Sequence, residues 1–392
     1  MKSTWSFQLC IFAFCGATLL AQTTRTSVFS VVSNLGGNVG SEPLLVTLAE
    51  DSSGNLWGTT SSNGPQTFGT VFSLTTIGAI TPVYNFQMAT GYVPIGGMTL
   101  GLDGNFYGIT SSGGKFTDGV VYQLTPAGVY TVLHNFSGTN EGKNPITLIL
   151  GQDGNFYGAT ASGGTDPSGG TIFEITPNGV LTTLYNFNSA QSSEPGPLVA
   201  ASDGTFYGAA QYGGGSTVCS NGCGTIFHLT SSGTLVTLHD FSGSDGSFPV
   251  GLTIGKDGNL YGTTGEGGDL TRCGKVGCGT IFKMTPSGTF KTLHVFKGTD
   301  GALPGGALTQ GPDGNFYGVA AGGLKPNIFG AVYGITPKGS FKVLHFFAST
   351  DGNEPEGALL LHTDRKFYGT TQLGGTNVAG VVYSLDLGFP AR

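Results

Sequence analysis

The hexapeptide Asp103-Gly104-Asn105-Phe106-Tyr107-Gly108 recurs unchanged at residues 153–158 and 313–318. Close variants occur four more times, so the final glycine of the hexapeptide returns every 50 to 56 residues along the chain. The aligned glycines are Gly58, Gly108, Gly158, Gly208, Gly262, Gly318 and Gly369. This period is too long for a leucine-rich or ankyrin repeat. The chain therefore contains seven tandem units of roughly fifty residues.

Each unit contains four short runs of apolar and β-branched residues, which predict four β-strands. In the fifth unit these runs are Val250–Gly255, Asn259–Thr264, Gly279–Thr285 and Thr289–Phe296. Asp257-Gly258 separates the first two runs, and this pair favours the positive φ angles of a two-residue hairpin turn. The last two runs are separated by residues 285–288, whose Thr-Pro-Ser-Gly sequence is typical of a tight turn. We therefore expect four antiparallel strands, joined in order, in every unit.

The strands carry large apolar side chains on both faces, as residues 105–110 and 170–175 illustrate. Both faces of each four-stranded sheet must therefore be covered. A radial stack of sheets covers them and also hides the strand edges, which predicts an all-β, seven-bladed β-propeller with four antiparallel strands per blade. An open β-solenoid fits less well, because solenoid coils are usually shorter and lack paired hairpin turns.

The two ends of the repeat region complement each other. Residues 28–35 align with the fourth strand of a unit, for which residues 131–136 are an example, whereas the last unit stops after its third strand at Val381–Asp386. We therefore expect the ring to be closed by the N-terminal strand, which would complete the last blade.

The termini flank this propeller with segments of a different character. Residues 1–21 hold one lysine followed by an apolar run that ends in Ala21-Gln22, which predicts a secretory signal peptide. An uncleaved membrane anchor is the alternative, but the run is short for a bilayer span and polar sequence follows directly. The predicted organisation is a signal peptide at 1–21, a short linker at 22–27, the propeller at 28–386 and a C-terminal tail at 387–392. The mature protein is expected to be secreted or periplasmic.

Composition narrows the classes of partner. The chain has 70 glycines, 38% apolar residues and only 10% charged residues, which indicates a folded protein with many turns. Its formal charge of −7 provides no basic footprint for nucleic acid or for an anionic membrane surface. No P-loop, nucleophile elbow or His-Glu-x-x-His motif occurs in a suitable context. We expect a monomer that binds no nucleic acid and does not insert into a membrane after signal cleavage.

The repeat resembles the GloVer tandem-repeat family of exported bacterial proteins, whose units share the DGNFYG, GTIF and TPxG elements over residues 28–386. That family is defined by its repeat, so the resemblance implies a fold and export rather than an activity. Residues 311–315 and 335–337 are also similar, more distantly, to streptogramin B lyase propellers, which carry DGNLWFTE. The position of the glutamate in that motif is held by threonine or alanine in this chain, which argues against a shared lyase chemistry. These residues are Thr60, Thr110, Thr160, Ala210, Thr264, Ala320 and Thr371.

Two loops of consecutive units contain cysteine pairs, Cys219 with Cys223 and Cys273 with Cys278. Because an exported protein meets an oxidising environment, we expect one local disulfide in each loop. A four-thiolate zinc site shared between the blades is the alternative.

Histidines and carboxylates supply the other candidates. His134, His239, His294 and His345 recur in the fourth strand, where Tyr84 and Tyr185 replace them in two units, which indicates a packing and hydrogen-bonding role. His228 and His362 fall outside this register and are candidate surface residues. The loop that enters each blade contains a proline, and six acidic residues lie just before it. These candidate ligand-binding residues are Glu42, Glu194, Glu354, Asp245, Asp300 and Asp351.

These carboxylates have two interpretations. They would bind a calcium ion or a sugar near the mouth of the central channel, since oxygen ligands suit calcium, or they would only make turns and face solvent. We expect no other cofactor and no catalytic residue.

Loop variability predicts where a ligand binds. The Asp-Gly-Asn and Thr-Pro-x-Gly turns of one face hardly vary, whereas the loops of the opposite face vary in length and charge, and binding surfaces usually form on variable loops. The preferred hypothesis is a non-catalytic binding or scaffold propeller for an extracellular glycan, peptide or surface protein. The alternatives are an extracellular lyase or hydrolase with its site at the channel mouth, and a structural envelope component.

Overall fold

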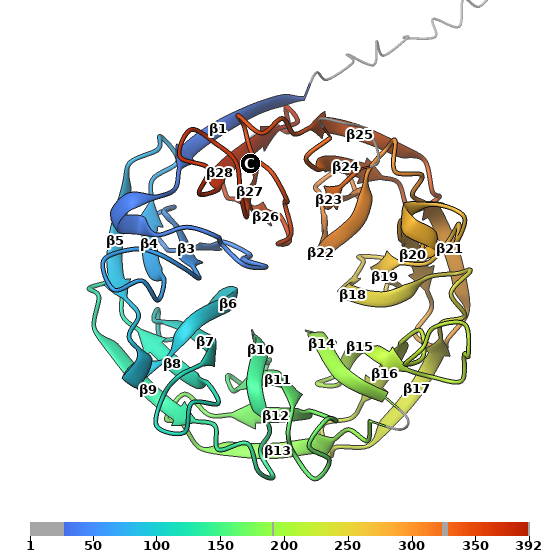
Figure 1. Cartoon of the computed structure of the whole chain (residues 1–392), viewed down its shortest axis with the longest axis horizontal. Helices are drawn as coiled ribbons and strands as arrows, with labels where there is room; N and C mark the ends of the chain where they lie inside the picture. The colour runs from blue at the N-terminus through green and yellow to red at the C-terminus, as the bar shows by residue number, and fades with distance from the viewer. Residues whose placement is uncertain (1–26, 190–191, 324–327, 391–392) are drawn as a thin grey trace, which may run out of the picture.

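The structure is a computed structural model, and it describes residues 27–189, 192–323 and 328–390. The expected signal peptide and residues 22–26 of the linker lie outside the described residues. Seven four-stranded sheets surround a central channel, and each sheet runs radially from an innermost to an outermost strand (Figure 1). The predicted all-β, seven-bladed propeller with four antiparallel strands per blade is confirmed.

Each blade has four strand positions, counted from the channel outward. The innermost strands are β2 (Ala49–Glu50), β6 (Tyr92–Leu100), β10 (Lys143–Leu150), β14 (Ser192–Ala200), β18 (Ser247–Ile254), β22 (Ala302–Gln310) and β26 (Leu360–Leu361). The second strands are β3 (Leu56–Thr60), β7 (Phe106–Ser112), β11 (Phe156–Ser162), β15 (Phe206–Gly213), β19 (Leu260–Glu266), β23 (Phe316–Gly322) and β27 (Phe367–Thr371). The third strands are β4 (Thr70–Leu74), β8 (Val120–Leu124), β12 (Thr171–Ile175), β16 (Thr225–Leu229), β20 (Thr280–Met284), β24 (Ala331–Ile335) and β28 (Val381–Asp386). The outermost strands are β5 (Ile80–Asn85), β9 (Tyr130–Asn135), β13 (Leu181–Asn186), β17 (Leu235–Asp240), β21 (Phe290–Val295), β25 (Phe341–Phe346) and β1 (Val28–Asn34).

Ring closure also follows the prediction. The N-terminal strand β1 pairs antiparallel with β28, from Val28 opposite Asp386 to Asn34 opposite Val381, and so supplies the outermost strand of the seventh blade. The Phe29 ring stacks on His345 of the sixth blade with ring centroids 3.7 Å apart. The closing strand therefore has the same neighbour contact as other outer strands, because His239 stacks on Phe290 in the same way at 3.9 Å.

The hairpin turns differ from the two-residue type expected. In the fifth blade the Gly255 N–H donates to the Asn259 carbonyl and the Gly258 N–H donates to the Gly255 carbonyl, so three residues lie between the paired ends. Only Gly258 adopts a positive φ, 74°, whereas Asp257 does not. This is a type I turn followed by a left-handed glycine, the common three-residue hairpin. The aspartate is therefore needed for its side chain rather than for its backbone conformation.

That side chain clamps the hairpin. Asp257 accepts hydrogen bonds from the Asn259 backbone N–H at 3.2 Å and from the Tyr261 hydroxyl at 2.9 Å. Burial alone raises the pKa of Asp257, but hydrogen bonds from Lys283, Asn259 and Tyr261 outweigh burial and hold that pKa well below its ordinary value. Equivalent bonds join Asp51 to Trp57, Asp103 to Tyr107, Asp153 to Tyr157, Asp313 to Tyr317 and Asp364 to Tyr368.

The last glycine of the hexapeptide is fixed by packing between strands. A Cβ atom on Gly158 would lie 2.3 Å from Cζ of Phe173, and one on Gly108 would lie 2.4 Å from the hydroxyl of Tyr122. Phe173 and Tyr122 are fully buried in the core between blades. Any larger residue would displace an aromatic ring from the core, which explains why glycine returns in every unit.

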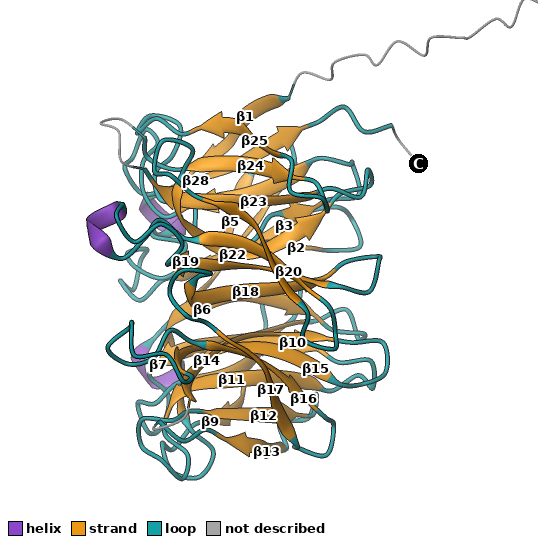
Figure 2. Ribbon diagram, turned by 90° about the vertical axis from the view of Figure 1, so that its right-hand side faces the viewer, coloured by secondary structure: helices purple, strands orange, loops and turns teal. Residues whose placement is uncertain are grey.

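The two faces of the ring are built differently. The side view places longer loops and the short 3-10 helices η1 (Gly37–Val39), η2 (Met88–Thr90) and η3 (Cys273–Lys275) on one face and tight hairpin turns on the other (Figure 2). We call these the looped face and the tight-turn face. No helix within the described residues is long and apolar enough to cross a membrane.

Candidate functional site

The looped face is held together by a repeated clasp around the mouth of the channel. In every blade the residue before the entry proline has a positive φ of 52° to 58°, an unfavourable conformation for a side-chain-bearing residue that costs about 1–3 kcal/mol. These residues are Glu42, Val93, Asn144, Glu194, Phe248, Leu303 and Glu354. Five of them donate their backbone N–H to a carbonyl of the preceding blade, as Glu354 does to Phe329 at 2.9 Å; the other four are Glu42, Asn144, Phe248 and Leu303. The clasp thus fixes seven variable side chains at equivalent places around the channel mouth.

Three of the predicted carboxylates occupy this ring, but they do not gather at one point. Glu42 and Glu354 belong to the adjacent first and seventh blades, whereas Glu194 belongs to the fourth blade, across the channel (Figure 1). All three side chains are half-buried. Only Glu194 lines the cavities described below, and burial raises the pKa of its carboxyl above the ordinary value.

The other three carboxylates are bonded within the outer rim. Asp245 accepts a hydrogen bond from the Ser242 backbone N–H at 2.8 Å, while its other oxygen lies 3.0 Å from Nε2 of His239 on β17. The same arrangement joins Asp300 to His294 at 3.1 Å and Asp351 to His345 at 3.1 Å. These Asp–His contacts link each of the three loops to the outermost strand of the preceding blade. The predicted packing and hydrogen-bonding role of the repeated histidines fits this geometry.

The two histidines outside the register differ from each other. The sequence predicts His362 at the surface, but it is only 5% exposed, and its Nε2 donates to the Gly54 carbonyl at 3.0 Å. It therefore joins the seventh blade to the first on the tight-turn face. His228 lies half-buried on β16 beside Tyr207, with ring centroids 4.8 Å apart.

The cysteines are paired as expected, Cys219 with Cys223 and Cys273 with Cys278. Their thiols are therefore not available for the zinc site considered as the alternative. The carbonyl of Cys223 accepts the Phe248 N–H at 3.0 Å, and that of Cys278 accepts the Leu303 N–H at 3.0 Å. The disulfides thus secure the clasp at the two ring positions with large apolar side chains.

A cavity of about 410 Å³ occupies the channel, and inner strands or blade-entry segments of all seven blades line it. Its wall is mainly aliphatic, with Leu45, Ile95, Ile146 and Val250 among the side chains. A smaller cavity of about 210 Å³ shares Leu45 and Val250 with it. Small-molecule sites are typically cavities of this size with an apolar wall and a few polar groups.

Glu356 is the functional candidate that sequence reasoning missed. It follows the entry proline, where the other six blades carry apolar residues or glycine, namely Leu44, Ile95, Ile146, Gly196, Val250 and Gly305. Glu356 lines both the channel cavity and the smaller one. Burial, and then the nearby carboxylate of Glu354, raises the pKa of Glu356. A comparison of this position across the seven units would have shown one charged residue among apolar ones.

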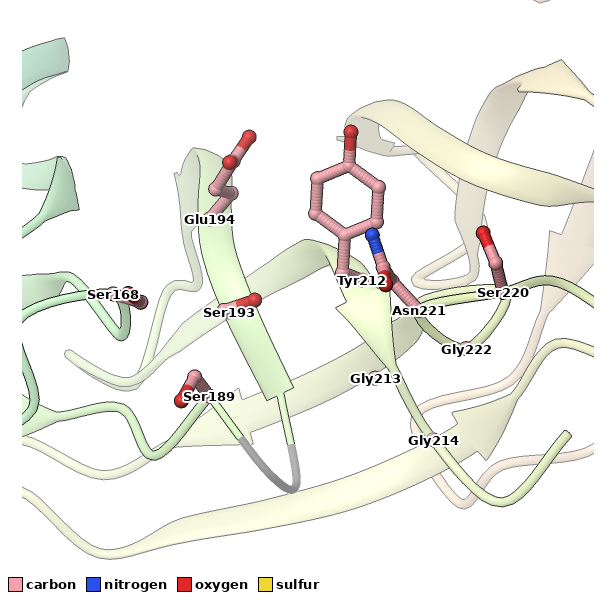
Figure 3. A pocket seen from close by; sticks show the side chains of 10 residues that line it. All are labelled: Ser168, Ser189, Ser193, Glu194, Tyr212, Gly213, Gly214, Ser220, Asn221 and Gly222. Carbon is pink, nitrogen blue, oxygen red and sulfur yellow. The ribbon is translucent and has the colours of Figure 1, made fainter. Parts of the chain in front are cut away.

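A second pocket, of about 500 Å³, opens between the third and fourth blades on the looped face. Glu194 on β14 and Tyr212 on β15 extend toward the same side, with Asn221 next to Tyr212 (Figure 3). The remaining lining residues are small or polar: Ser168, Ser189, Ser193, Gly213, Gly214, Ser220 and Gly222.

The walls of this pocket are fixed by local bonds. Ser220, Asn221 and Gly222 lie inside the loop closed by the Cys219–Cys223 disulfide, and the Gly213 N–H donates to the Asn221 carbonyl at 2.7 Å. Burial, and then the carboxylates of Glu194 and Glu266, raises the pKa of Tyr212, so its hydroxyl is neutral and able to donate. The pocket therefore offers one aromatic ring, one carboxylate, one amide and several hydroxyls.

No group of three or more His, Cys, Asp or Glu side chains within the described residues is placed to hold a metal ion. The predicted carboxylates therefore do not form a calcium-binding cluster within the described residues.

Comparisons with known proteins place the fold. The structure is similar to that of the virginiamycin B lyase from Staphylococcus aureus, with a TM-score of 0.60, 15% identity and coverage of 92% of this chain and 98% of the lyase. It is also similar to the extracellular domain of the protein BT4673 from B. thetaiotaomicron, with a TM-score of 0.56, 11% identity and coverage of 90% of this chain and 40% of that protein. At these identities the likeness extends to the propeller fold alone. No curated protein matches the sequence.

The sequence itself matches a family model twice. The matches cover residues 15–219 and 194–383, which together include nearly all of the seven repeat units, and the model describes the Gloeobacter/Verrucomicrobia repeat. The resemblance inferred from the hexapeptide is confirmed, and the chain belongs to the Gloeobacter/Verrucomicrobia repeat family.

Proposed function

We propose that this protein is an exported, non-catalytic binding propeller that holds a neutral glycan on its looped face. The observation that carries the proposal is the pocket of about 500 Å³ between the third and fourth blades. A sugar has an apolar ring face and a periphery of hydroxyls. Tyr212 offers an aromatic surface of matching character, while Glu194 and Asn221 offer an acceptor and an amide for the hydroxyls.

The position of Tyr212 supports a specific role. Tyr212 lies opposite Ser193 in the β14–β15 ladder. The equivalent positions in the first three blades are serines, Ser62, Ser112 and Ser162. The fold therefore does not need a tyrosine at this position. The Tyr212 ring packs edge-on against Phe248 of the fifth blade, with ring centroids 5.6 Å apart, and this contact holds the ring beside the pocket.

Two features support export and a binding role. Both cysteine pairs form disulfides, which are typical of proteins in oxidising compartments outside the cytoplasm. The pocket lies on loops carried by a rigid ring, an arrangement that brings several polar groups to bear on one ligand. We propose that the protein acts as a monomer, because a ring of seven blades is complete within one chain.

The test is a glycan-array screen of the mature protein, followed by titration calorimetry with the best glycan. Tyr212→Ser gives the fourth blade the residue of the first three, so it should preserve the fold and weaken binding. Glu194→Gln should weaken binding as well, by about tenfold or more if the carboxylate is desolvated in the complex. Glu42→Gln changes the same ring position in the first blade, outside the pocket, and should bind like the wild type. Equal loss of affinity in all three variants would contradict the proposed pocket.

An extracellular lyase or hydrolase is the second candidate. Burial and the carboxylate of Glu354 raise the pKa of Glu356, a property that suits a general acid. If the glycan identified on the array is cleaved on incubation with wild-type protein and survives with Glu356→Gln, the enzyme interpretation replaces the binding one.

A further inference from the structure

The channel cavity has a chemical character distinct from that of the glycan pocket. The channel cavity of about 410 Å³ and a second cavity of about 210 Å³ share Leu45, Val250 and Glu356 as lining residues, so the two adjoin and together make up the channel site. Phe248 and Leu303 also line the smaller cavity. Leu303 is 45% exposed and Leu45 39% exposed, so these apolar groups are accessible to a ligand.

The charged groups in this space all have the same sign. Glu194, Glu266 and Glu356 line it, and no lysine, arginine or histidine is among the lining residues. None of the three carboxylates has an ion-pair partner within the described part of the chain. A half-buried carboxylate in an apolar wall is costly unless a cation accompanies it.

The missing cation is better supplied by an organic group than by a metal ion. The carboxylates do not form a cluster of three or more ligands within the described residues. The wall around them is aliphatic, which suits a hydrocarbon body rather than a hydrated ion. We propose that the channel mouth binds an organic ammonium compound with an apolar body, with Glu356 as the partner of the ammonium group and the aliphatic ring of the channel as the contact for the body.

Glu356 is the partner that the fold singles out. Its position carries a hydrophobic residue or glycine in the other six blades, so no structural need for a carboxylate is repeated around the ring. Glu354 and the backbone N–H of Leu45 act directly on its carboxyl group, and Glu194 and Glu266 are the other carboxylates that line the same cavities. A bound ammonium group would stabilise the ionised form of Glu356 and reverse the rise in its pKa. Binding near and below that pKa should therefore release protons.

The experiment uses n-octylammonium as the probe in titration calorimetry with the mature protein near neutral pH. Three analogues separate the contributions: octanol lacks the charge, octanoate reverses it, and ethylammonium lacks the long body. We expect saturable one-to-one binding of octylammonium and at least about tenfold weaker binding of each analogue, because loss of the charge or of the buried chain removes a major part of the contact. Equal binding of octanol and octylammonium would overturn the proposal.

Variants locate the site. Glu356→Gln should weaken octylammonium binding by about tenfold or more, and Glu356→Leu, which installs the residue of the first blade, should abolish the preference for octylammonium over octanol. Glu42→Gln is the matched control and should bind octylammonium like the wild type.

The affinity of the wild type should fall as the pH falls through the pKa of Glu356, and this dependence should be weaker in Glu356→Gln. Wild-type affinity in a folded Glu356→Gln protein would refute the assignment.

The channel site and the glycan pocket can be tested independently. Glu356 lines the channel cavities and not the glycan pocket, so Glu356→Gln should leave glycan binding unchanged while it weakens octylammonium binding. Failure of one proposal therefore does not decide the other.

Discussion

The tight-turn face and the looped face are carried by the same strands, yet they use their polar residues in different ways. On the tight-turn face, Asp103 and Asp257 each accept a hydrogen bond from the hydroxyl of the tyrosine four residues later in the chain. This arrangement repeats from blade to blade. On the looped face, Glu194 and Glu356 occupy repeated backbone positions without an ion-pair partner among the described residues. Repetition therefore indicates a structural role, whereas departure from the repeat indicates a candidate function.

The largest expected effect comes from opening the ring that supports both faces. A mature protein that starts at residue 36 lacks β1, which leaves β28 with an unpaired edge and exposes Phe347 and Tyr383, the rings against which Phe29 packs. The expected loss is on the order of 5 kcal/mol, since a buried aromatic or aliphatic side chain contributes about 1.5–3 kcal/mol. Thermal unfolding should show the seventh blade melting first.

A protein that starts at residue 27 is the control, because it keeps β1 and should melt like the full mature form. If the shorter protein melts at the same temperature as the control, closure by β1 does not stabilise the ring.

A pair of aspartates within the fifth blade tests the difference between the faces directly. Asp257→Ala on the tight-turn face removes the acceptor of the hydroxyl of the buried Tyr261, at an expected cost of about 2 kcal/mol, whereas the solvent-exposed pair with Lys283 adds little. Asp269→Ala on the looped face removes bonds to Thr271 and Arg272, but these bonds are exposed to solvent and the loss of stability should be clearly smaller. Urea unfolding of both variants gives the two values, and similar losses would show that the faces do not differ in this respect.

The sequence predicted the repetitive part of the molecule well. The seven hexapeptides predicted the number of blades, and the paired turn signals predicted the strand order. The surplus strand at residues 28–35 predicted the ring closure. All three are local patterns. The cysteine pairing followed from spacing and compartment. The turn type was wrong because Asp-Gly fits both a two-residue and a three-residue hairpin. In the three-residue turn that forms, Asp257 accepts a hydrogen bond from the Tyr261 hydroxyl.

The candidate site was predicted less well, for a physical reason. Carboxylates near the entry proline look alike in sequence, but one set turns outward to His239, His294 and His345, while Glu194 faces cavities. Side-chain direction depends on packing between blades, which no local pattern records. Glu356 was detectable only as a charged residue where the other units carry apolar residues or glycine, and Tyr212 only as the aromatic residue at a position that varies among serine, glutamate, glycine and leucine.

The disulfides provide a test of intermediate size. Replacing Cys219 and Cys223 by serine opens a very short loop, so the loss in global stability should not exceed about 2 kcal/mol. The local effect should be sharper, because the Cys223 carbonyl accepts the Phe248 N–H. Hydrogen exchange of the Phe248 amide should accelerate while that of Leu303 stays protected.

The double replacement of Cys273 and Cys278 is the matched control, and it should accelerate Leu303 instead, since the Cys278 carbonyl accepts the Leu303 N–H. Equal acceleration of both amides in either variant would show that the two clasps are not secured independently.

The smallest expected effect is the pH dependence of stability at the channel mouth. The folded-state pKa of Glu356 is raised, first by burial and then by Glu354, so above that pKa its charge weakens the fold, and the penalty disappears as the pH falls toward the unfolded value near 4.5. Glu356→Gln should therefore stabilise the protein slightly near neutral pH, by less than about 1 kcal/mol because solvent still screens a half-buried carboxylate, and should have no effect near pH 4. The pKa of Asp257 is lowered, so its contribution is present above its unfolded value of 3.8 and is lost only as the pH falls further. Urea unfolding of wild type, Glu356→Gln and Asp257→Ala from neutral pH down to about pH 4 should therefore show the Glu356→Gln difference shrinking while most of the Asp257→Ala difference persists. A Glu356→Gln difference that stayed constant over this range would mean that its carboxyl is not desolvated, and would remove the contrast between a satisfied tight-turn face and an unsatisfied channel mouth.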